Sequence, residues 1–212
     1  MRKPGQPVEF HHRFPDVQCG AASGAIRSQG MEVIRQLKKL SGKILFTNPW
    51  WKYKLDAYEL PNGEPGEYHY VETPGSVMVI PLHEDGSVTF VRQYRYLNQR
   101  VSLELPGGGL IAGTDPADMA RDELREEAGL VAGELLRLGE HNPWNGVTSE
   151  LCQVFLATGL SAVENAPDET EEFEIVRLTP SQYQRAIADG GLWDGMTLAA
   201  LQLFSIHEGS RG

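Results

Sequence analysis

Short β-rich runs alternate with helical patterns along the chain. Before residue 75, the predicted strands are 44–47, 51–60 and 67–72, and Pro61-Asn62-Gly63 is a turn signal between the last two. Residues 31–40 instead carry Val33, Ile34, Leu37 and Leu40 at helical spacing, which predicts a short helix. We therefore expect residues 31–74 to form a small unit with one helix and an antiparallel sheet.

The pattern after residue 75 predicts a larger domain over 75–208. Runs 76–82 and 87–94 are joined by His83-Glu84-Asp85-Gly86, which predicts a hairpin. Further strands are expected at 101–105, 135–140, 152–158 and 174–178, and helices at 116–128, 180–189 and 196–206. This mixture predicts an α+β fold with a mixed sheet flanked by helices. Residues 1–30 are rich in Gly, Pro, Ser and Gln and predict a flexible tail.

The composition narrows the classes of function. A formal net charge of −10 argues against nucleic acid as a partner, because an acidic surface repels it. No run of about 18 apolar residues is present, and no apolar stretch follows the N-terminus as a signal peptide requires, so we expect no membrane partner and a cytoplasmic location. Cys19 and Cys152 lie too far apart in sequence to indicate a disulfide framework or a metal cluster.

The helix predicted at 116–128 has strong boundary signals. Asp115 is a good N-cap, Pro116 suits the first turn, and Gly129 suits the position after the last turn. At 100° per residue, one arc collects the apolar side chains and predicts the buried stripe. The residues of that stripe are Ala117, Ala120, Leu124 and Ala128.

Beside this stripe lies an acidic arc made of Asp122, Glu123, Glu126 and Glu127, while Arg121 and Arg125 project to the other side. Like charges at these spacings cost a helix about 0.2–0.5 kcal/mol per pair, and hard divalent cations favour carboxylate oxygen. The arc therefore indicates either a metal site or an ordinary solvated face. The preceding Gly107-Gly108-Gly109 turn favours the metal site, because glycines allow a ligand close to the backbone.

These residues resemble the signature of the Nudix hydrolases. The matching positions are Gly108, Gly113, Glu123, Leu124, Glu126, Glu127, Gly129 and Leu130. The runs 91–96, 103–108, 168–172 and 191–195 resemble the ADP-ribose pyrophosphatase branch of the family. The chain departs from the signature at two positions, where Asp122 replaces an arginine and Thr114 replaces a glutamate.

The resemblance implies a Nudix-type α/β/α sandwich with a mixed sheet. It also implies Mg²⁺-dependent hydrolysis of the pyrophosphate bond of a nucleoside diphosphate sugar, with Mn²⁺ as a possible substitute. The leading candidate reaction converts ADP-ribose to AMP and ribose 5-phosphate. A UDP-sugar or GDP-mannose hydrolase is an alternative, and a nucleotide-binding module that does not cleave is another, favoured by the change at Asp122.

By the same resemblance, Glu123 and Glu127 are the principal metal ligands, and the Gly107 carbonyl completes the shell. Glu126 bridges metals or orders the attacking water. The general base of the family often comes from a mobile acidic loop, here residues 168–172, which could equally be a solvated loop. Within that loop Glu171 and Glu169 are the candidates for the base.

Five further residues are candidates for substrate binding. Arg95 and Arg92 either bind phosphate or ribose or form structural ion pairs. Glu104 either holds an outer-shell water or pairs with a neighbouring strand. Trp51 either stacks the base across a dimer or belongs to a core or interface, and Trp144 lies in a loop that contacts substrate in relatives. We also expect a homodimer through residues 40–75, because a small antiparallel unit with exposed edges is marginally stable alone.

Overall fold

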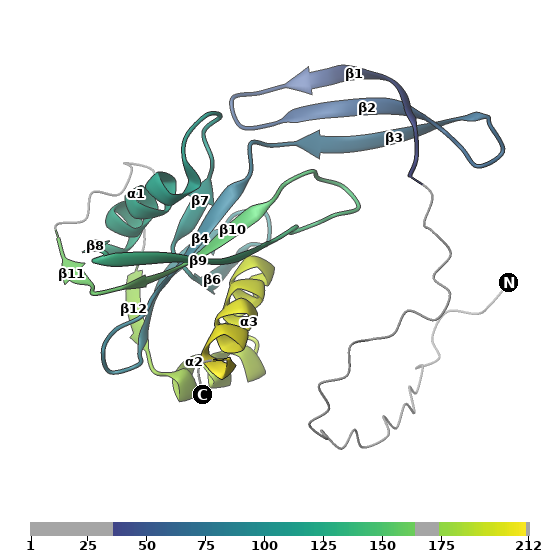
Figure 1. Ribbon diagram of the computed structural model, residues 1–212. Coiled ribbons are helices and arrows are strands. Elements are labelled where there is room, and N and C mark those ends of the chain that lie inside the picture. Colours follow the sequence, from purple (N-terminus) through teal and green to yellow (C-terminus); the bar gives the residue numbers. More distant parts are fainter. Residues whose placement is uncertain (1–35, 164–173, 211–212) are drawn as a thin grey trace, which may run out of the picture. The chain divides into compact units, whose positions relative to one another are not determined.

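A computed structural model describes residues 36–163 and 174–210 of the chain (Figure 1). Its strands are β1 (Lys39–Thr47), β2 (Lys52–Glu59), β3 (Pro65–Glu72), β4 (Ser76–Pro81), β5 (Val88–Arg95), β6 (Arg100–Glu104), β7 (Gly107–Gly109), β8 (Leu130–Val131), β9 (Glu134–His141), β10 (Cys152–Thr158), β11 (Ser161–Ala162) and β12 (Glu174–Leu178). The helices are α1 (Pro116–Ala128), α2 (Pro180–Ala188) and α3 (Gly195–Gly209). None of the helices in these ranges is long and apolar enough to cross a membrane.

The central sheet has the strand order β7-β4-β10-β9. Strand β4 pairs parallel with β10 and antiparallel with β7, and β10 pairs antiparallel with β9, so the sheet is mixed. Every residue of β4 is buried, as expected for a strand that has a partner on each edge and layers on both faces. The parallel pairing requires a crossover connection, and α1 lies in it.

Two apolar clusters pack on opposite faces of this sheet, which confirms the predicted α/β/α layering (Figure 1). One cluster joins Val77 and Val79 of β4 to Leu124 and its neighbours on α1. The other joins Met78 and Ile80 to side chains of α3 and of β5. The alternation along β4 follows the two-residue period of a strand and sends successive side chains to different layers. The α+β class predicted from the sequence is correct.

The predicted hairpin between β4 and β5 is largely wrong. The turn is present, because the His83 amide bonds to the Ser87 carbonyl at 2.9 Å and Leu82 bridges Val88. Beyond this bridge the two strands separate, and β5 joins a second, antiparallel sheet with the order β12-β5-β6. The strands separate because β7 and β10 occupy both edges of β4 and leave no hydrogen-bonding groups for β5.

The N-terminal sheet has the order β1-β2-β3, and both pairings are antiparallel. The turn at 61–63 is confirmed by a hydrogen bond from the Gly63 amide to the Leu60 carbonyl and by a Gly63 φ of 87°. The helix predicted for 31–40 is wrong at its C-terminal end, because Lys39 and Leu40 belong to β1. Lys39 instead pairs with Asp56 on β2 at 2.7 Å, so cross-strand pairing overrides a weak local preference. Residues 31–35 lie outside the described ranges.

Helix α1 begins and ends as the sequence predicts. The Asp115 side chain accepts a hydrogen bond from the Ala117 amide at 2.7 Å, which caps the first turn. Gly129 has a φ of 62°, in the left-handed region that favours glycine after a helix. The glycine segment before the helix differs from the prediction, because Gly107–Gly109 forms the edge strand β7 and not a turn. Strand β7 pairs with β4 and places its glycines next to α1.

Candidate active site

A cavity of about 300 Å³ opens where β6, β7, α1 and the start of α3 meet. Its lining brings together residues that are far apart in the sequence, including Arg95, Glu104, Gly107, Glu127, Glu150 and Asp194. A larger cavity of about 790 Å³ lies between α2, α3 and the turn after β4. None of the predicted site residues within the described ranges lines that larger cavity, whereas Arg95, Glu104, Gly107 and Glu127 line the smaller one, which is therefore the candidate site.

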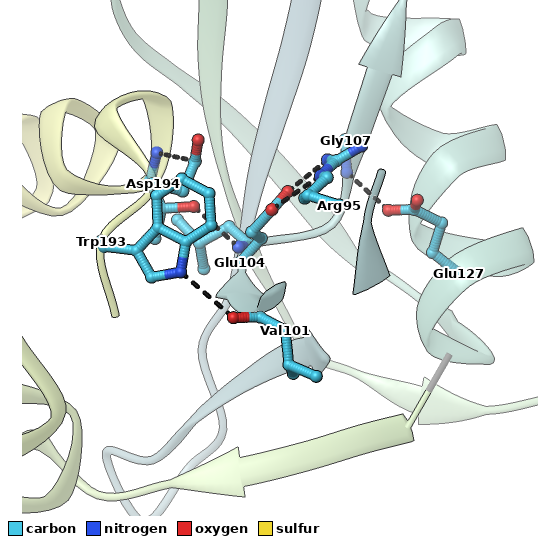
Figure 2. A network of polar contacts seen from close by, with 9 residues as sticks. Arg95, Val101, Glu104, Gly107, Glu127, Trp193 and Asp194 are labelled. Atoms are coloured by element: carbon cyan, nitrogen blue, oxygen red, sulfur yellow. Dashed lines mark hydrogen bonds and ion pairs between the residues drawn. The ribbon is translucent and has the colours of Figure 1, made fainter. Parts of the chain in front are cut away.

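Glu127 lies at the border between the core and this cavity. Its side chain is 6% exposed, and its Oε2 accepts a hydrogen bond from the Gly107 amide at 2.8 Å (Figure 2). The bond forms because β7 and α1 both contact β4, which brings positions 107 and 127 together. A nearly buried carboxylate held by a backbone amide stays ionised at lower cost than an unpaired one.

The two glycines that begin β7 leave no space for a side chain. A Cβ at Gly107 would overlap the Val77 carbonyl oxygen, and a Cβ at Gly108 would overlap the Glu123 carboxylate. Glu123 is therefore packed directly over the backbone of β7, one helical turn before Glu127. The glycine segment and the two glutamates form one packed arrangement, although the sequence separates them by 14 residues or more.

One arginine side chain of α1 pairs with the acidic arc, contrary to the prediction that both arginines project to the other side. Arg125 pairs with Glu126 at 2.6 Å and with Asp122 at 3.5 Å. Its long side chain bends around the helix surface and partly compensates the negative charge. Arg121 does point elsewhere and pairs with Asp118 at 3.1 Å. The charge crowding inferred from the sequence is thus weaker than the count of carboxylates indicates.

Arg95 and Glu104 form a two-point ion pair in the lining of the same cavity, and Figure 2 shows the guanidinium beside Gly107. The Arg95 Nε donates to Glu104 Oε1 at 2.8 Å, and Nη2 pairs with the other carboxylate oxygen. The Glu104 side chain is 5% exposed, whereas that of Arg95 is 47% exposed. The carboxylate raises the pKa of Arg95, chiefly through the hydrogen bond, so the guanidinium is firmly cationic. Glu104 thus pairs with a neighbouring strand and also faces the cavity.

The other substrate-binding candidates lie in different places. Arg92 does not line the cavity, and it pairs with Glu174 at 2.8 Å on the exposed face of β5 and β12. Trp144 is 66% exposed and also lies outside the cavity lining. Trp51 lines an adjoining cavity of about 470 Å³, together with Trp50. Glu169 and Glu171 lie outside the described residues.

The two cavities share Gly109 and Glu150 in their linings, so they adjoin. Sequence reasoning missed Glu150, which accepts a hydrogen bond from the Ser76 hydroxyl at 2.6 Å. It also missed Asp194, which caps α3 by accepting from the Thr197 amide at 2.7 Å. The helix predicted at 196–206 begins one residue earlier in the structure, at Gly195, and an aspartate directly before a helix is a recognisable N-cap signal, so Asp194 was open to prediction. Nothing in the sequence pattern marks Glu150.

Comparison with known proteins agrees with this geometry. The NUDIX domain family matches residues 72–198. A methanol dehydrogenase activator of Bacillus methanolicus is 31% identical over 173 residues, which cover 81% of this chain and 94% of the relative. An ADP-ribose pyrophosphatase of Bacillus subtilis strain 168 is 29% identical with the same coverage. A GDP-mannose pyrophosphatase of Yersinia pestis strain Pestoides F is 26% identical over 77% of this chain and 89% of the relative.

Among solved structures, an ADP compounds hydrolase superimposes with a TM-score of 0.74 at 20% identity, covering 86% of this chain and 99% of the other. That likeness supports the fold. The chain therefore belongs to the Nudix family, as a pyrophosphohydrolase that resembles the ADP-ribose pyrophosphatases.

Proposed function

We propose that this protein hydrolyses the pyrophosphate bond of a nucleoside diphosphate sugar with the help of Mg²⁺, and that ADP-ribose is its foremost substrate. The observation that carries the proposal is the nearly buried Glu127, held by the Gly107 amide in a cavity that Arg95 also lines. Carboxylates and a fixed cation in one cavity suit a phosphate chain bound through a divalent metal. Cleavage of ADP-ribose would yield AMP and ribose 5-phosphate.

The donor set fits a hard divalent ion. Glu127 offers a carboxylate beside the backbone of Gly107 and Glu123 offers one beside Gly108, and Glu126 lies on the same helix. In the described ranges no three His, Cys, Asp or Glu side chains form a ready-made metal cluster. Mg²⁺ does not require one, because it keeps several waters and commonly takes one or two carboxylates together with substrate phosphates. When bound, the metal would neutralise phosphate charge and lower the pKa of a coordinated water.

The residues around the phosphates would divide the remaining work. Arg95 would bind a phosphate oxygen through the guanidinium N–H groups that do not pair with Glu104. Glu126 would order the attacking water, and Arg125 would orient it in place of the signature arginine that Asp122 replaces. Glu171 and Glu169 remain our candidates for the general base.

The adjoining cavity supports a place for the nucleobase. Trp50 and Trp51 line it, and indole rings offer flat apolar faces on which a base can stack. Its shared border with the Glu127 cavity would let one substrate occupy both spaces. Trp144 and Arg92 lie apart from these linings, and we keep them only as contacts for the far end of the substrate.

The relative named a GDP-mannose pyrophosphatase supports a second candidate, a hydrolase of GDP-mannose or of a UDP-sugar. The cavity lined by Trp50 and Trp51 does not select between bases, because stacking tolerates any of them. A module that binds nucleotides without cleaving them is the third reading. The pairing of Arg125 with Glu126 argues against it, because it supplies an arginine where the signature lacks one.

A panel of ADP-ribose, GDP-mannose and UDP-glucose, each with Mg²⁺, Mn²⁺ or EDTA, tests the function. We expect the largest kcat/KM for ADP-ribose with release of AMP, and loss of turnover in EDTA. A higher kcat/KM for GDP-mannose or UDP-glucose would show that ADP-ribose is not the foremost substrate, while the assignment as a pyrophosphate hydrolase would stand. Binding of these compounds without turnover at saturating Mg²⁺ would contradict the hydrolase and support the module that binds nucleotides without cleaving them.

We also propose a homodimer formed through the N-terminal sheet. All nine residues of β1 are exposed, and three consecutive apolar side chains, Ile44, Leu45 and Phe46, are 55%, 43% and 55% exposed. An edge strand with such a surface favours pairing with a second copy.

We predict that light scattering will report a mass of two chains, and that Phe46→Asp will shift it to one. Leu136→Asp is the matched control, because Leu136 is 48% exposed on β9 and should leave the dimer intact. A wild-type protein that stays monomeric at micromolar concentration would contradict the proposed dimer.

A further inference from the structure

The segment between β6 and β7 joins two sheets. Strand β6 belongs to the sheet β12-β5-β6 and ends at Glu104, whereas β7 begins at Gly107 on the edge of the central sheet. Only Leu105 and Pro106 lie between them. We call residues 104–107 the junction. Both of its ends line the cavity, and they contact Arg95 and Glu127 respectively, so its conformation sets how these two side chains lie relative to each other.

The backbone donors inside the junction are bound by side chains from two helices. Pro106 has no N–H, so the Leu105 and Gly107 amides are the donors after Glu104. The Leu105 amide donates to the Thr197 Oγ1 of α3 at 3.0 Å, across 92 residues of sequence. The Gly107 amide donates to Glu127 of α1 at 2.8 Å (Figure 2). The amide donors of the junction are therefore bound from α3 at one point and from α1 at the other, while its Pro106 carbonyl accepts from the Val79 amide of β4 at 2.8 Å.

Thr197 is itself held in place and buried from solvent. It is 0% exposed, and Leu105 is 2% exposed, so water cannot replace the bond between them. The Thr197 amide donates to Asp194, the N-cap of α3, at 2.7 Å, which places Thr197 in the first turn of the helix. Nearby, the Trp193 Nε1 donates to the Val101 carbonyl at 3.1 Å and ties the start of β6 to the same turn (Figure 2).

From these contacts we infer that Thr197 is a positioning residue for hydrolysis. Its hydroxyl fixes the junction so that Glu104, which orients Arg95, and Gly107, which orients Glu127, keep one relative position in the cavity lining. Thr197 does not line the cavity, so it acts through the junction and not on the substrate. The inference rests on the proposed roles of Arg95 and Glu127.

The test compares Thr197→Val with Thr197→Ser. Valine has the shape of threonine but accepts no hydrogen bond, whereas serine keeps the acceptor. We expect Thr197→Val to lower kcat between about tenfold and a hundredfold, because displacements near 1 Å have such effects. We also expect weaker Mn²⁺ binding in calorimetry without substrate, since the Gly107 amide that orients Glu127 is then held less firmly. Thr197→Ser should restore both quantities to within about threefold of wild type, because its hydroxyl can accept the same bond.

Thr89→Val is the matched control. Thr89 is 3% exposed on β5, and its hydroxyl bonds the His83 ring at 2.8 Å, away from the cavity lining. We expect this variant to lower the melting temperature while kcat and Mn²⁺ binding stay unchanged. If Thr197→Val behaves in the same way, Thr197 is only structural and the inference is wrong.

If Thr197→Val does not fold, Thr197→Ala tests the same bond with a smaller side chain, and wild-type kcat in that variant overturns the inference. Failure of the proposed function would be distinguishable from failure of this inference. The wild type would then show no turnover with any of the nucleoside diphosphate sugars.

Discussion

Glu127→Gln is expected to lower turnover on the order of a thousandfold, equal to about 4 kcal/mol of transition-state stabilisation, while the fold survives. The fold should survive because the glutamine carbonyl oxygen still accepts the hydrogen bond from the Gly107 amide. Turnover should fall because the neutral amide removes the negative charge that would hold a divalent ion in the cavity. Turnover with ADP-ribose and Mn²⁺ affinity by calorimetry should both decrease, and the melting temperature should change little.

Glu134→Gln provides the control for this experiment. Glu134 is an exposed residue of β9 and lies outside the cavity lining, so the same loss of charge should leave turnover unchanged. Normal activity of Glu127→Gln would remove Glu127 from the metal shell. A collapse of the melting temperature would show instead that its bond to the Gly107 amide is essential to the fold.

Local signals predicted the parts of the site that depend on neighbouring residues. The capping aspartate, the first-turn proline and the closing glycine identified α1, and the structure confirms its span of 116–128. Strands β10 and β12 also match the predicted bounds of 152–158 and 174–178. These elements form where period, caps and turns agree, so the sequence contains the necessary information within a short window. The buried Ala120, Leu124 and Ala128 stripe follows from the same periodicity.

The predictions fail where contacts between segments far apart in the sequence determine the structure. The preference for a helix at Leu37–Leu40 is weak, and pairing of Lys39 with β2 overrides it. Separation of β4 from β5 depends on β10, which lies about 60 residues further along the chain and occupies the edge of β4. Glu150 lines the cavity next to Ser76 of β4, whose hydroxyl donates to it across 74 residues of sequence. No periodicity or cap within a short window contains these facts.

Arg125 illustrates a limit of helical projection. A projection assigns each residue an angle, and it placed Arg125 away from the acidic arc. The guanidinium is several bonds from the backbone, so it reaches Glu126 and Asp122 across that angle. Projection predicts the buried face well, because short apolar side chains stay near their Cβ direction. It predicts the partners of long charged side chains poorly.

Arg95→Met is expected to lower both stability and activity, and a paired substitution separates the two effects. Removing Arg95 leaves the Glu104 carboxylate, which is 5% exposed, without its partner. Because the Arg95 side chain is 47% exposed and partly screened by solvent, we expect a loss of about 1–3 kcal/mol in the free energy of unfolding. Glu104→Gln should cost less, since a half-exposed guanidinium is readily solvated.

The double variant Arg95→Met/Glu104→Gln should recover most of the stability lost in Arg95→Met, because no charge then stays buried. Its activity should stay low, about tenfold to a hundredfold below wild type, because the proposed phosphate-binding cation is missing. Chemical denaturation and kcat/KM for ADP-ribose measure the two effects independently. Activity that returns together with stability would make the pair purely structural.

The pair formed by Arg92 and Glu174 is the internal control for this cycle. It lies on the same strand as Arg95, joins its partner at 2.8 Å and has side chains that are 50% and 63% exposed. Exposed pairs of this kind contribute about 0–1 kcal/mol, so Arg92→Met and Glu174→Gln should change stability little, alone or together. A loss of kcat/KM in Arg92→Met much smaller than that in Arg95→Met would assign the phosphate to Arg95 and leave Arg92 as a contact for the far end of the substrate. A loss of activity in Arg92→Met as large as in Arg95→Met would instead mean that charge anywhere on β5 suffices.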